Sequence, residues 1–180
     1  MCTLNYGHLW IIIGVMKRIL LTGMSGTGKS TVILKLVSLG YKAVDLDNNE
    51  FSHWIEIDAD TTSLTPAPGK DWVWRTDRVQ ELLSTEDTNI LIVSGCAENL
   101  GQFLPQFDQI ILLSAPPQIL VERLTARTNN AYGKQPYEIA QVLVLQQIIE
   151  PLLRKASSYE IDTSSGIDHV ITKILYLLKK

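Results

Sequence analysis

Residues 23–30 read Gly-Met-Ser-Gly-Thr-Gly-Lys-Ser, which is the Gly-x-x-x-x-Gly-Lys-Ser pattern of a phosphate-binding loop. An apolar run typical of a buried strand, residues 18–22, precedes this stretch, and a helical pattern, residues 29–39, follows it. The glycines allow a tight turn in which consecutive backbone N–H groups point at a phosphate. The helix adds the N–H groups of its first turn and the positive end of its dipole. The stretch therefore predicts a binding site for ATP or GTP.

Two side chains of this loop have chemical roles of their own. Lys29 provides a mobile cation for the β- and γ-phosphates, and the Ser30 hydroxyl is a hard oxygen ligand for Mg²⁺. A glycine-rich turn that binds nothing is the alternative, and the flanking strand and helix argue against it. We expect ATP and Mg²⁺ as cofactors, with nucleotide contacts from Gly23, Ser25, Gly26, Thr27, Gly28, Lys29, Ser30 and Thr31.

The composition limits the class of protein. The chain has 180 residues, 46% of them hydrophobic, and a formal net charge of −3, which is typical of one globular domain with a substantial core. A nucleic-acid-binding domain is normally basic, so we expect no nucleic-acid partner. The apolar run at residues 9–15 is far shorter than the roughly 20 residues of a membrane helix, so we expect no membrane partner. Cys2 and Cys96 are too few for a disulfide framework and favour a reducing cytoplasm.

Strand and helix patterns alternate along most of the chain. We expect residues 1–15 to form a loose extension, although Trp10 and its apolar neighbours could pack on a sheet edge, and residues 16–180 to form a single domain. Alternation of this kind is typical of a parallel sheet covered on both faces. It predicts a three-layer α/β/α P-loop fold with a five-stranded parallel sheet, whose strands are residues 18–22, 42–46, 90–94, 109–113 and 159–162.

Two carboxylates follow the second predicted strand. Asp45 and Asp47 occupy alternate positions of an extended segment, so both side chains point to the same side. One could hold Mg²⁺, directly or through water, while the other accepts the proton of a substrate hydroxyl. We assign Asp45 to the metal and Asp47 to catalysis, with the reverse assignment left open; a solvated strand end is the other interpretation. The apolar strands themselves end in Ser94 and Ser114, which cannot supply the carboxylate that motor and transporter ATPases place there.

A second set of cations lies after the fourth predicted strand. Phosphoryl transfer needs cations that neutralise the negative charge of the migrating γ-phosphoryl group, in addition to Lys29 and Mg²⁺. Arg123 and Arg127 are four residues apart on one helix face, directly before a polar segment, residues 128–136, that we expect to act as a lid. Arg127 is predicted to be catalytic and Arg123 to contact the nucleotide; a solvated helix surface is the alternative for each.

With these features, residues 16 to about 178 resemble the shikimate kinase, gluconate kinase and adenylate kinase group of small P-loop phosphotransferases. Shikimate kinases carry an Asp-x-Asp after the second strand, which Asp45-Leu46-Asp47 matches, and an arginine-bearing helix and lid after the fourth strand. Their final strand ends in Val-Asp-Thr, here Ile161-Asp162-Thr163. The resemblance implies that Thr163 lies near the adenine.

The acceptor side matches this group less closely. Trp74-Arg75 resembles the aromatic–arginine pair of the substrate segment, and Gly95 partly matches a glycine segment after the third strand. Shikimate kinases also have an arginine directly before a Pro-Leu pair of the long helix, which grips the shikimate carboxylate. Residues 148–150 are Ile-Ile-Glu before Pro151-Leu152, so that cation is missing and shikimate is a doubtful substrate.

Residues 48–74 form a tryptophan-rich segment where this group binds its phosphate acceptor. Its tryptophans, Trp74 among them, could stack on a sugar or base ring, or could form a small hydrophobic core of their own. Arg75 and Arg78 share one face of the helix expected at residues 76–83 and could hold a carboxylate or phosphate bidentately. Asp77 beside them could instead engage them in a structural ion pair.

These expectations combine into a cytoplasmic, ATP- and Mg²⁺-dependent kinase, monomeric or dimeric, that phosphorylates a hydroxyl or phosphate of a small metabolite. We expect the acceptor to contact Asp47, Trp74, Arg75, Arg78 and Gly95. A nucleoside or nucleotide kinase is one alternative, in which the arginines meet a nucleotide phosphate. A nucleotide-binding regulatory ATPase without a small acceptor is the other. The sequence does not identify the acceptor.

Overall fold

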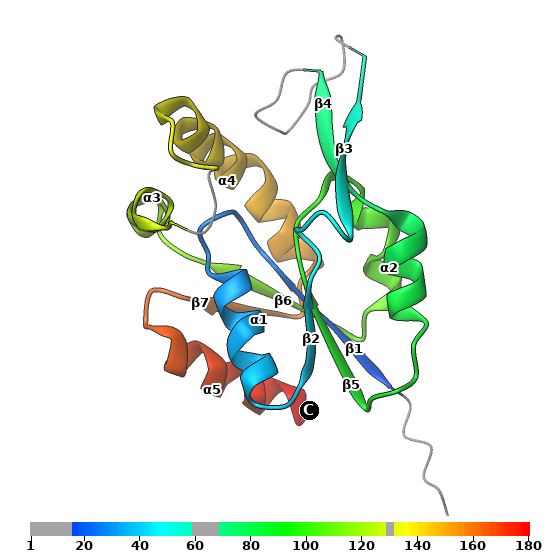
Figure 1. The fold of residues 1–180 in the computed structure, drawn as a ribbon. Coiled ribbons are helices and arrows are strands. Elements are labelled where there is room, and N and C mark those ends of the chain that lie inside the picture. The colour runs from blue at the N-terminus through cyan, green and yellow to red at the C-terminus, as the bar shows by residue number, and fades with distance from the viewer. Residues whose placement is uncertain (1–15, 59–68, 129–131) are drawn as a thin grey trace, which may run out of the picture.

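The computed structural model describes residues 16–58, 69–128 and 132–180, so the extension expected at residues 1–15 lies outside the described part. The central sheet has five strands in the order β2-β5-β1-β6-β7, and every neighbouring pair is parallel (Figure 1). The predicted five-stranded parallel sheet is therefore confirmed. Its strands are β1 (Lys17–Thr22), β2 (Lys42–Asp45), β5 (Ile90–Ser94), β6 (Gln109–Ser114) and β7 (Tyr159–Asp162).

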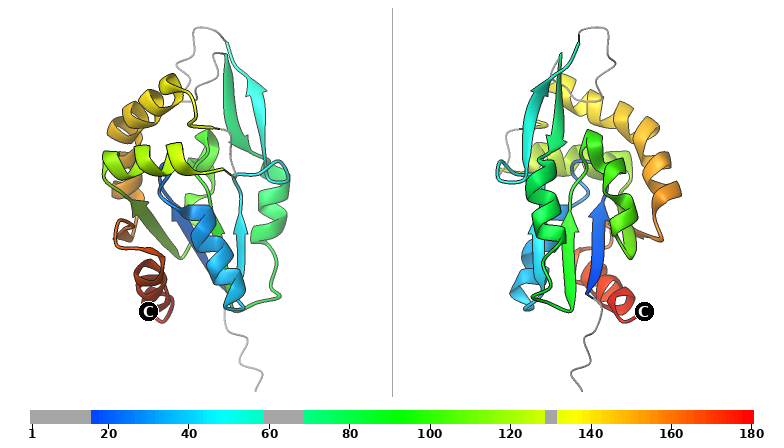
Figure 2. Two further views of the ribbon diagram at one scale, coloured as in Figure 1. Left: turned by 60° about the vertical axis from the view of Figure 1, so that its left-hand side comes forward. Right: turned by 90° about the vertical axis from the view of Figure 1, so that its right-hand side faces the viewer.

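Helices cover both faces of this sheet (Figure 2). Because successive strand residues point to opposite faces, Ile19 and Leu21 of β1 pack with α1 and α5, whereas Leu20 between them packs with α2, α4 and the short turns η1 and η2. All three side chains are fully buried, which is why the strand reads as a continuous apolar run. The helical elements are α1 (Lys29–Ser38), α2 (Thr76–Leu83), η1 (Glu98–Gln102), η2 (Leu104–Gln106), α3 (Pro117–Ala126), α4 (Pro136–Ala156) and α5 (Ile167–Leu178).

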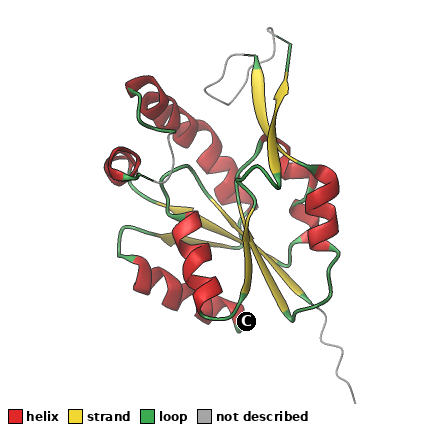
Figure 3. Ribbon diagram, viewed as in Figure 1, coloured by secondary structure: helices red, strands yellow, loops and turns green. Residues whose placement is uncertain are grey.

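The tryptophan-rich segment contains an antiparallel hairpin, which the sequence pattern did not reveal. Its strands are β3 (Ser52–Glu56) and β4 (Lys70–Trp74), and the hairpin stands clear of the central sheet (Figure 3). Trp54 and Trp72 are directly opposite each other in the register, with ring centroids 5.1 Å apart and planes inclined by 60°. Such a cross-strand aromatic pair stabilises a two-stranded sheet that has few other neighbours.

Three strands bring distant polar residues to one end of the sheet. In the parallel register Asp45 of β2 aligns with Ser94 of β5, and Ser94 aligns with Leu21 of β1, one residue before the end of that strand. Ligands of open α/β sheets bind at these carboxyl ends of the strands. The register therefore places the predicted carboxylate segment beside the start of the phosphate-binding loop.

Among the described helices, none is both long enough and apolar enough to cross a membrane.

Candidate active site

The phosphate-binding loop turns sharply between β1 and α1. Gly26 and Gly28 have φ values of 91° and 94°, in the left-handed region that glycine adopts without strain. Gly23 has no room for a side chain, because a Cβ atom there would lie 2.2 Å from the carbonyl oxygen of Leu113 on β6. Thr27 closes the turn by donating from its backbone N–H and its hydroxyl to the Met24 carbonyl, at 3.2 and 2.8 Å. The glycines of the motif are thus required by this backbone path.

Lys29 lies across the loop rather than in solvent. Its side chain is 9% exposed, and its Nζ donates to the Gly23 carbonyl at 2.8 Å. The same Nζ lies 3.7 Å from Oδ2 of Asp47. The ammonium group is therefore held between the phosphate-binding loop and the carboxylate segment, where it can contact a phosphate and its acceptor together.

Ser30 and Asp45 form a pair of hard oxygen donors. The Ser30 hydroxyl donates to Oδ2 of Asp45 at 2.5 Å, and the Ser94 hydroxyl donates to Oδ1 of the same carboxylate at 3.1 Å. Ser30 is exposed at the first turn of α1, and Thr31 beside it is exposed as well. A hydroxyl and a carboxylate, with the remaining positions taken by water and phosphate oxygens, are the donor set that Mg²⁺ prefers. This pair therefore fits the predicted metal.

Asp47 is the second carboxylate and has a different environment. Its Oδ1 accepts a hydrogen bond from the Cys96 backbone N–H at 3.1 Å. Burial raises the pKa of Asp47, against the opposing effect of Lys29, and the charge of Asp45 raises this pKa further. The Cys96 N–H and the Trp74 indole act in the lowering direction. Because burial outweighs them, Asp47 binds a proton more readily than an ordinary aspartate.

Trp74 and Gly95 enclose this carboxylate. A Cβ atom on Gly95 would lie 2.8 Å from Asp47 Oδ1 and 2.8 Å from Cζ2 of Trp74, so only glycine fits between them. Trp74 is 1% exposed and packs on Phe103 with ring centroids 5.4 Å apart. Its indole N–H influences Asp47 without reaching hydrogen-bond geometry, and it has no hydrogen-bond partner within the described ranges. Trp74 therefore belongs to the hydrophobic core and packs against Gly95 on the core side of the site.

Arg123 of α3 links the phosphate-binding loop to Thr163, the residue directly after β7. Its guanidinium donates to the Thr163 hydroxyl at 2.9 Å and to the Thr163 carbonyl at 2.7 Å. A longer contact of 3.4 Å reaches the Gly26 carbonyl in the loop. The structure thus brings together two residues for which the sequence predicted a nucleotide contact, Arg123 and Thr163, although they are distant in the chain.

Arg127 follows at the end of α3. Its guanidinium donates to the Tyr132 carbonyl and, at 3.4 Å, to the Ser25 hydroxyl in the loop. Its Nε is buried and has no hydrogen-bond partner in the part of the chain that is described. Lys134 instead donates to the last carbonyls of α3 and ends that helix. Of the predicted lid, residues 129–131 lie outside the described part.

A cavity of about 660 Å³ opens in front of Lys29 and Asp47. Its described lining includes the Trp54–Trp72 pair, Glu98 of η1 and one long face of α4. No role in acceptor binding was predicted for Glu98 or for α4. The signal for α4 was present, because its cavity-lining residues recur at helical spacing of three and four: Val142, Leu145, Ile149, Leu152, Leu153 and Ala156.

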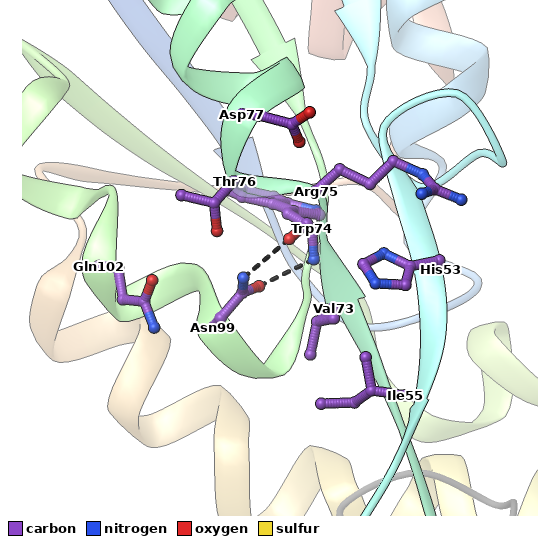
Figure 4. A pocket seen from close by; sticks show the side chains of 9 residues that line it. All are labelled: His53, Ile55, Val73, Trp74, Arg75, Thr76, Asp77, Asn99 and Gln102. Carbon is purple, nitrogen blue, oxygen red and sulfur yellow. Dashed lines mark hydrogen bonds between the residues drawn. The ribbon is translucent and has the colours of Figure 1, made fainter.

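The structure does not bring Arg75 and Arg78 to this cavity. Arg75 lines a separate groove of about 600 Å³ with His53, Asn99 and other residues, and its side chain extends past His53 (Figure 4). Asn99 fixes the wall of that groove through two 2.9 Å hydrogen bonds with the Trp74 backbone. Arg78 is exposed and lies 3.9 Å from Glu81 one turn along α2. The expected anion-binding pair is thus divided between a groove and the surface.

Comparisons with solved structures identify the fold. The shikimate kinase of Acinetobacter baumannii, determined in complex with shikimate, is 23% identical with a TM-score of 0.63, over 92% of this chain and 94% of that chain. The enzyme of Bacteroides thetaiotaomicron is 16% identical with a TM-score of 0.58, over 92% and 100%. That of Aquifex aeolicus is 17% identical with a TM-score of 0.55, over 90% and 96%. This chain therefore has the shikimate kinase fold.

Sequence comparisons extend this result. No curated protein sequence matches the chain significantly. Residues 19–144 match the family model described as an AAA domain, and this match covers the phosphate-binding loop, both carboxylates and the arginines of α3. The fold and the loop together agree with the kinase-like group that the sequence resembles. The chain belongs to this AAA-domain family of P-loop proteins.

Proposed function

We propose that this protein is a cytoplasmic, ATP- and Mg²⁺-dependent kinase that transfers the γ-phosphoryl group to a small metabolite. One observation carries the proposal: Asp47 lies 3.7 Å from the P-loop Lys29 at the inner end of a cavity of about 660 Å³. A nucleotide-binding loop alone would suit any P-loop ATPase. A proton acceptor next to it, facing a cavity large enough for a small molecule, is what a kinase adds.

The chain provides a separate set of groups for the nucleotide. Mg-ATP supplies the phosphoryl group and the metal charge when it is bound. Lys29, which donates to the Gly23 and Met24 carbonyls, would donate to phosphate oxygens instead, and the Ser30 hydroxyl and Asp45 would hold the cation. Arg127 offers guanidinium N–H groups, including a buried Nε without a partner among the described residues, beside Ser25 of the loop. These groups neutralise charge on the phosphates and orient them.

Asp47 acts on the acceptor. Its carboxylate accepts the hydroxyl proton while the acceptor oxygen forms a bond to phosphorus and the bond to ADP breaks. The raised pKa of Asp47 strengthens it as a base, and the Cys96 N–H holds one carboxylate oxygen so that the other faces Lys29. Lys29 thus orients the same carboxylate that receives the proton.

The proposal is tested by coupled ADP production with Mg-ATP across a panel of acceptors. The panel holds shikimate, gluconate, nucleosides, nucleoside monophosphates and related sugars, with Lys29→Ala as the blank. We expect one acceptor to raise turnover about 100-fold above basal hydrolysis, the scale of positioned acid–base catalysis. Slow Lys29-dependent hydrolysis that no compound stimulates would contradict the kinase and favour a nucleotide-binding regulatory ATPase.

A further inference from the structure

We propose that the acceptor is an alcohol without a negative charge, whose apolar or aromatic body lies between the hairpin and α4 while its hydroxyl meets Asp47. This inference rests on the kinase function proposed above. It narrows the acceptor from any hydroxyl or phosphate compound to non-anionic alcohols. It thereby separates this site from the acid that the Acinetobacter baumannii shikimate kinase holds in its structure.

The walls of the cavity are mainly apolar. Leu100 and Leu104 line it from η1 and η2, and Leu145, Ile149 and Leu152 line it from α4. Opposite them lies the aromatic pair of the hairpin, Trp54 and Trp72. The Trp54 side chain is 47% exposed, and covering its apolar surface with a ligand would be favourable. Leu152 is likewise 62% exposed. Apolar side chains on both sides of an open cavity favour a ligand that covers them with carbon rather than with charge.

The charges that line the cavity disfavour an anion. Lys29 is the sole cation in its described lining, and it is shared between the nucleotide loop and Asp47. Glu98 contributes a second carboxylate at the wall. Burial raises the pKa of Glu98, and the charge of the neighbouring Asp71 raises it further. A carboxylate or phosphate acceptor would meet repulsion there without a cation of its own.

Apart from Arg127, which lies against Ser25 of the phosphate-binding loop and is assigned to the nucleotide, the other arginines considered for the acceptor are engaged elsewhere. Arg154 of α4, one turn beyond the expected cation position, donates to Glu150 at 2.8 Å and to Glu160 at 2.7 Å. Arg75 faces the other groove (Figure 4), and Arg78 pairs with Glu81. These arginines could therefore neutralise an anion in the cavity only if the ion pairs of Arg154 or Arg78 broke, or if the Arg75 side chain turned out of its own groove. A neutral or cationic alcohol needs neither change.

Label transfer from γ-labelled ATP tests the charge of the acceptor. A cell extract freed of macromolecules is divided by anion exchange into an anionic and a non-anionic fraction before the protein is added. We expect label to enter an organic product from the non-anionic fraction. Product from the anionic fraction alone would overturn the inference and leave the kinase function standing. Label that reaches only inorganic phosphate with both fractions would overturn the kinase function itself.

A matched pair of variants on α4 then locates the binding surface. Leu152 lines the cavity and Ile148 does not, yet both side chains are exposed, so an arginine at either position is expected to fold. Leu152→Arg should lower kcat/KM for the non-anionic acceptor at least about tenfold, the scale on which a mismatched pocket wall discriminates. Ile148→Arg should change it less than about twofold. Equal effects of the two substitutions would show that the acceptor does not lie against this face.

Discussion

The two halves of the site are built in different ways. The half that we assign to the nucleotide is centred on one short loop and the start of one helix, to which Asp45, Arg123 and Arg127 add side chains; the Ser30 hydroxyl donates to Asp45 at 2.5 Å. The acceptor half takes its residues from the hairpin, from η1 and from the far end of α4, elements separated by more than half of the chain. The first half is polar and tightly hydrogen-bonded, whereas the second is mainly apolar and open.

This difference separates what is general in the protein from what is specific. Phosphate recognition relies on backbone N–H groups and on residues at fixed spacing, so it is the same in every P-loop protein. Acceptor recognition relies on side chains that tertiary packing places around a cavity, so it can change without altering the loop. Substitutions in the nucleotide half should therefore lower all ATP turnover. Substitutions in the acceptor half should change only the use of the acceptor, and some should have hardly any effect.

The largest effect is expected at Lys29. Lys29→Ala should lower ATP turnover about 1000-fold with or without acceptor, because it removes the cation that we propose contacts the transferred group. Steady-state ADP production measures this loss, and nucleotide binding by calorimetry shows whether affinity falls with it. Lys35→Ala on the same helix is the control, since its side chain is exposed and 4.0 Å from Asp168. A Lys29 variant that retains a tenth of the activity would contradict the loop assignment.

Asp47→Asn should distinguish the halves most sharply. We expect phosphoryl transfer to the acceptor to fall about 100- to 10,000-fold, while nucleotide binding stays within about threefold. Since burial raises the pKa of Asp47, wild-type transfer should decline as pH falls through that raised value, and the variant should lack this pH limb. Single-turnover kinetics across pH measure both. An equal loss of nucleotide binding would instead place Asp47 in the nucleotide half.

Asp47→Asn should lower activity but should not lower the stability of the fold. A carboxyl whose pKa is raised on folding costs stability when it is ionised; this cost declines as pH falls below the raised value and is gone only below the ordinary pKa of the unfolded chain. Asn carries no charge, so Asp47→Asn should unfold at the same or a higher temperature than the wild type at neutral pH. Thermal unfolding checks this expectation, with Asp168→Asn on the surface as the control. A lower unfolding temperature would mean that the ion pair with Lys29 outweighs burial.

Gly95→Ala, at the border between the two halves, should lower activity less than Lys29→Ala or Asp47→Asn. The new Cβ would lie 2.8 Å from Asp47 Oδ1 and equally close to Trp74, so one of them must move. We expect about 1–3 kcal/mol of lost stability and a fall in kcat of about tenfold. Chemical denaturation measures the first, with Gly101→Ala as the matched stability control because a Cβ there meets nothing within 4 Å. Equal stability of the two variants would refute the contact.

The smallest effect is expected at Arg75, which directly precedes α2, and at Arg78 within α2. Arg75→Ala and Arg78→Ala should each change kcat/KM for the acceptor less than about threefold, since one side chain faces the separate groove and the other forms an exposed ion pair. Acceptor saturation curves measure this. A loss above about tenfold at Arg75 would place its guanidinium on an anionic acceptor and would contradict the non-anionic class.

The sequence predicted the nucleotide half more completely than the acceptor half. The strand–loop–helix motif and the alternation of Asp45 and Asp47 are local patterns, and the parallel register then brings them together. The hairpin was not predicted, because residues 48–74 combine prolines and tryptophans without a clear period. Glu98 belongs to no motif in the sequence, and only the tertiary structure shows that it lines the cavity. Arg75 was placed by resemblance, which could not show its direction.

The most direct test of the kinase is the fate of the γ-phosphoryl group. The intact protein is mixed with Mg²⁺, γ-labelled ATP and an unfractionated small-molecule extract, and the labelled products are separated, with Asp47→Asn in parallel. We predict that the wild type moves label into an organic product and that Asp47→Asn binds nucleotide but forms almost none of it. Label that appears only as inorganic phosphate, at the same rate in both proteins, would contradict the account.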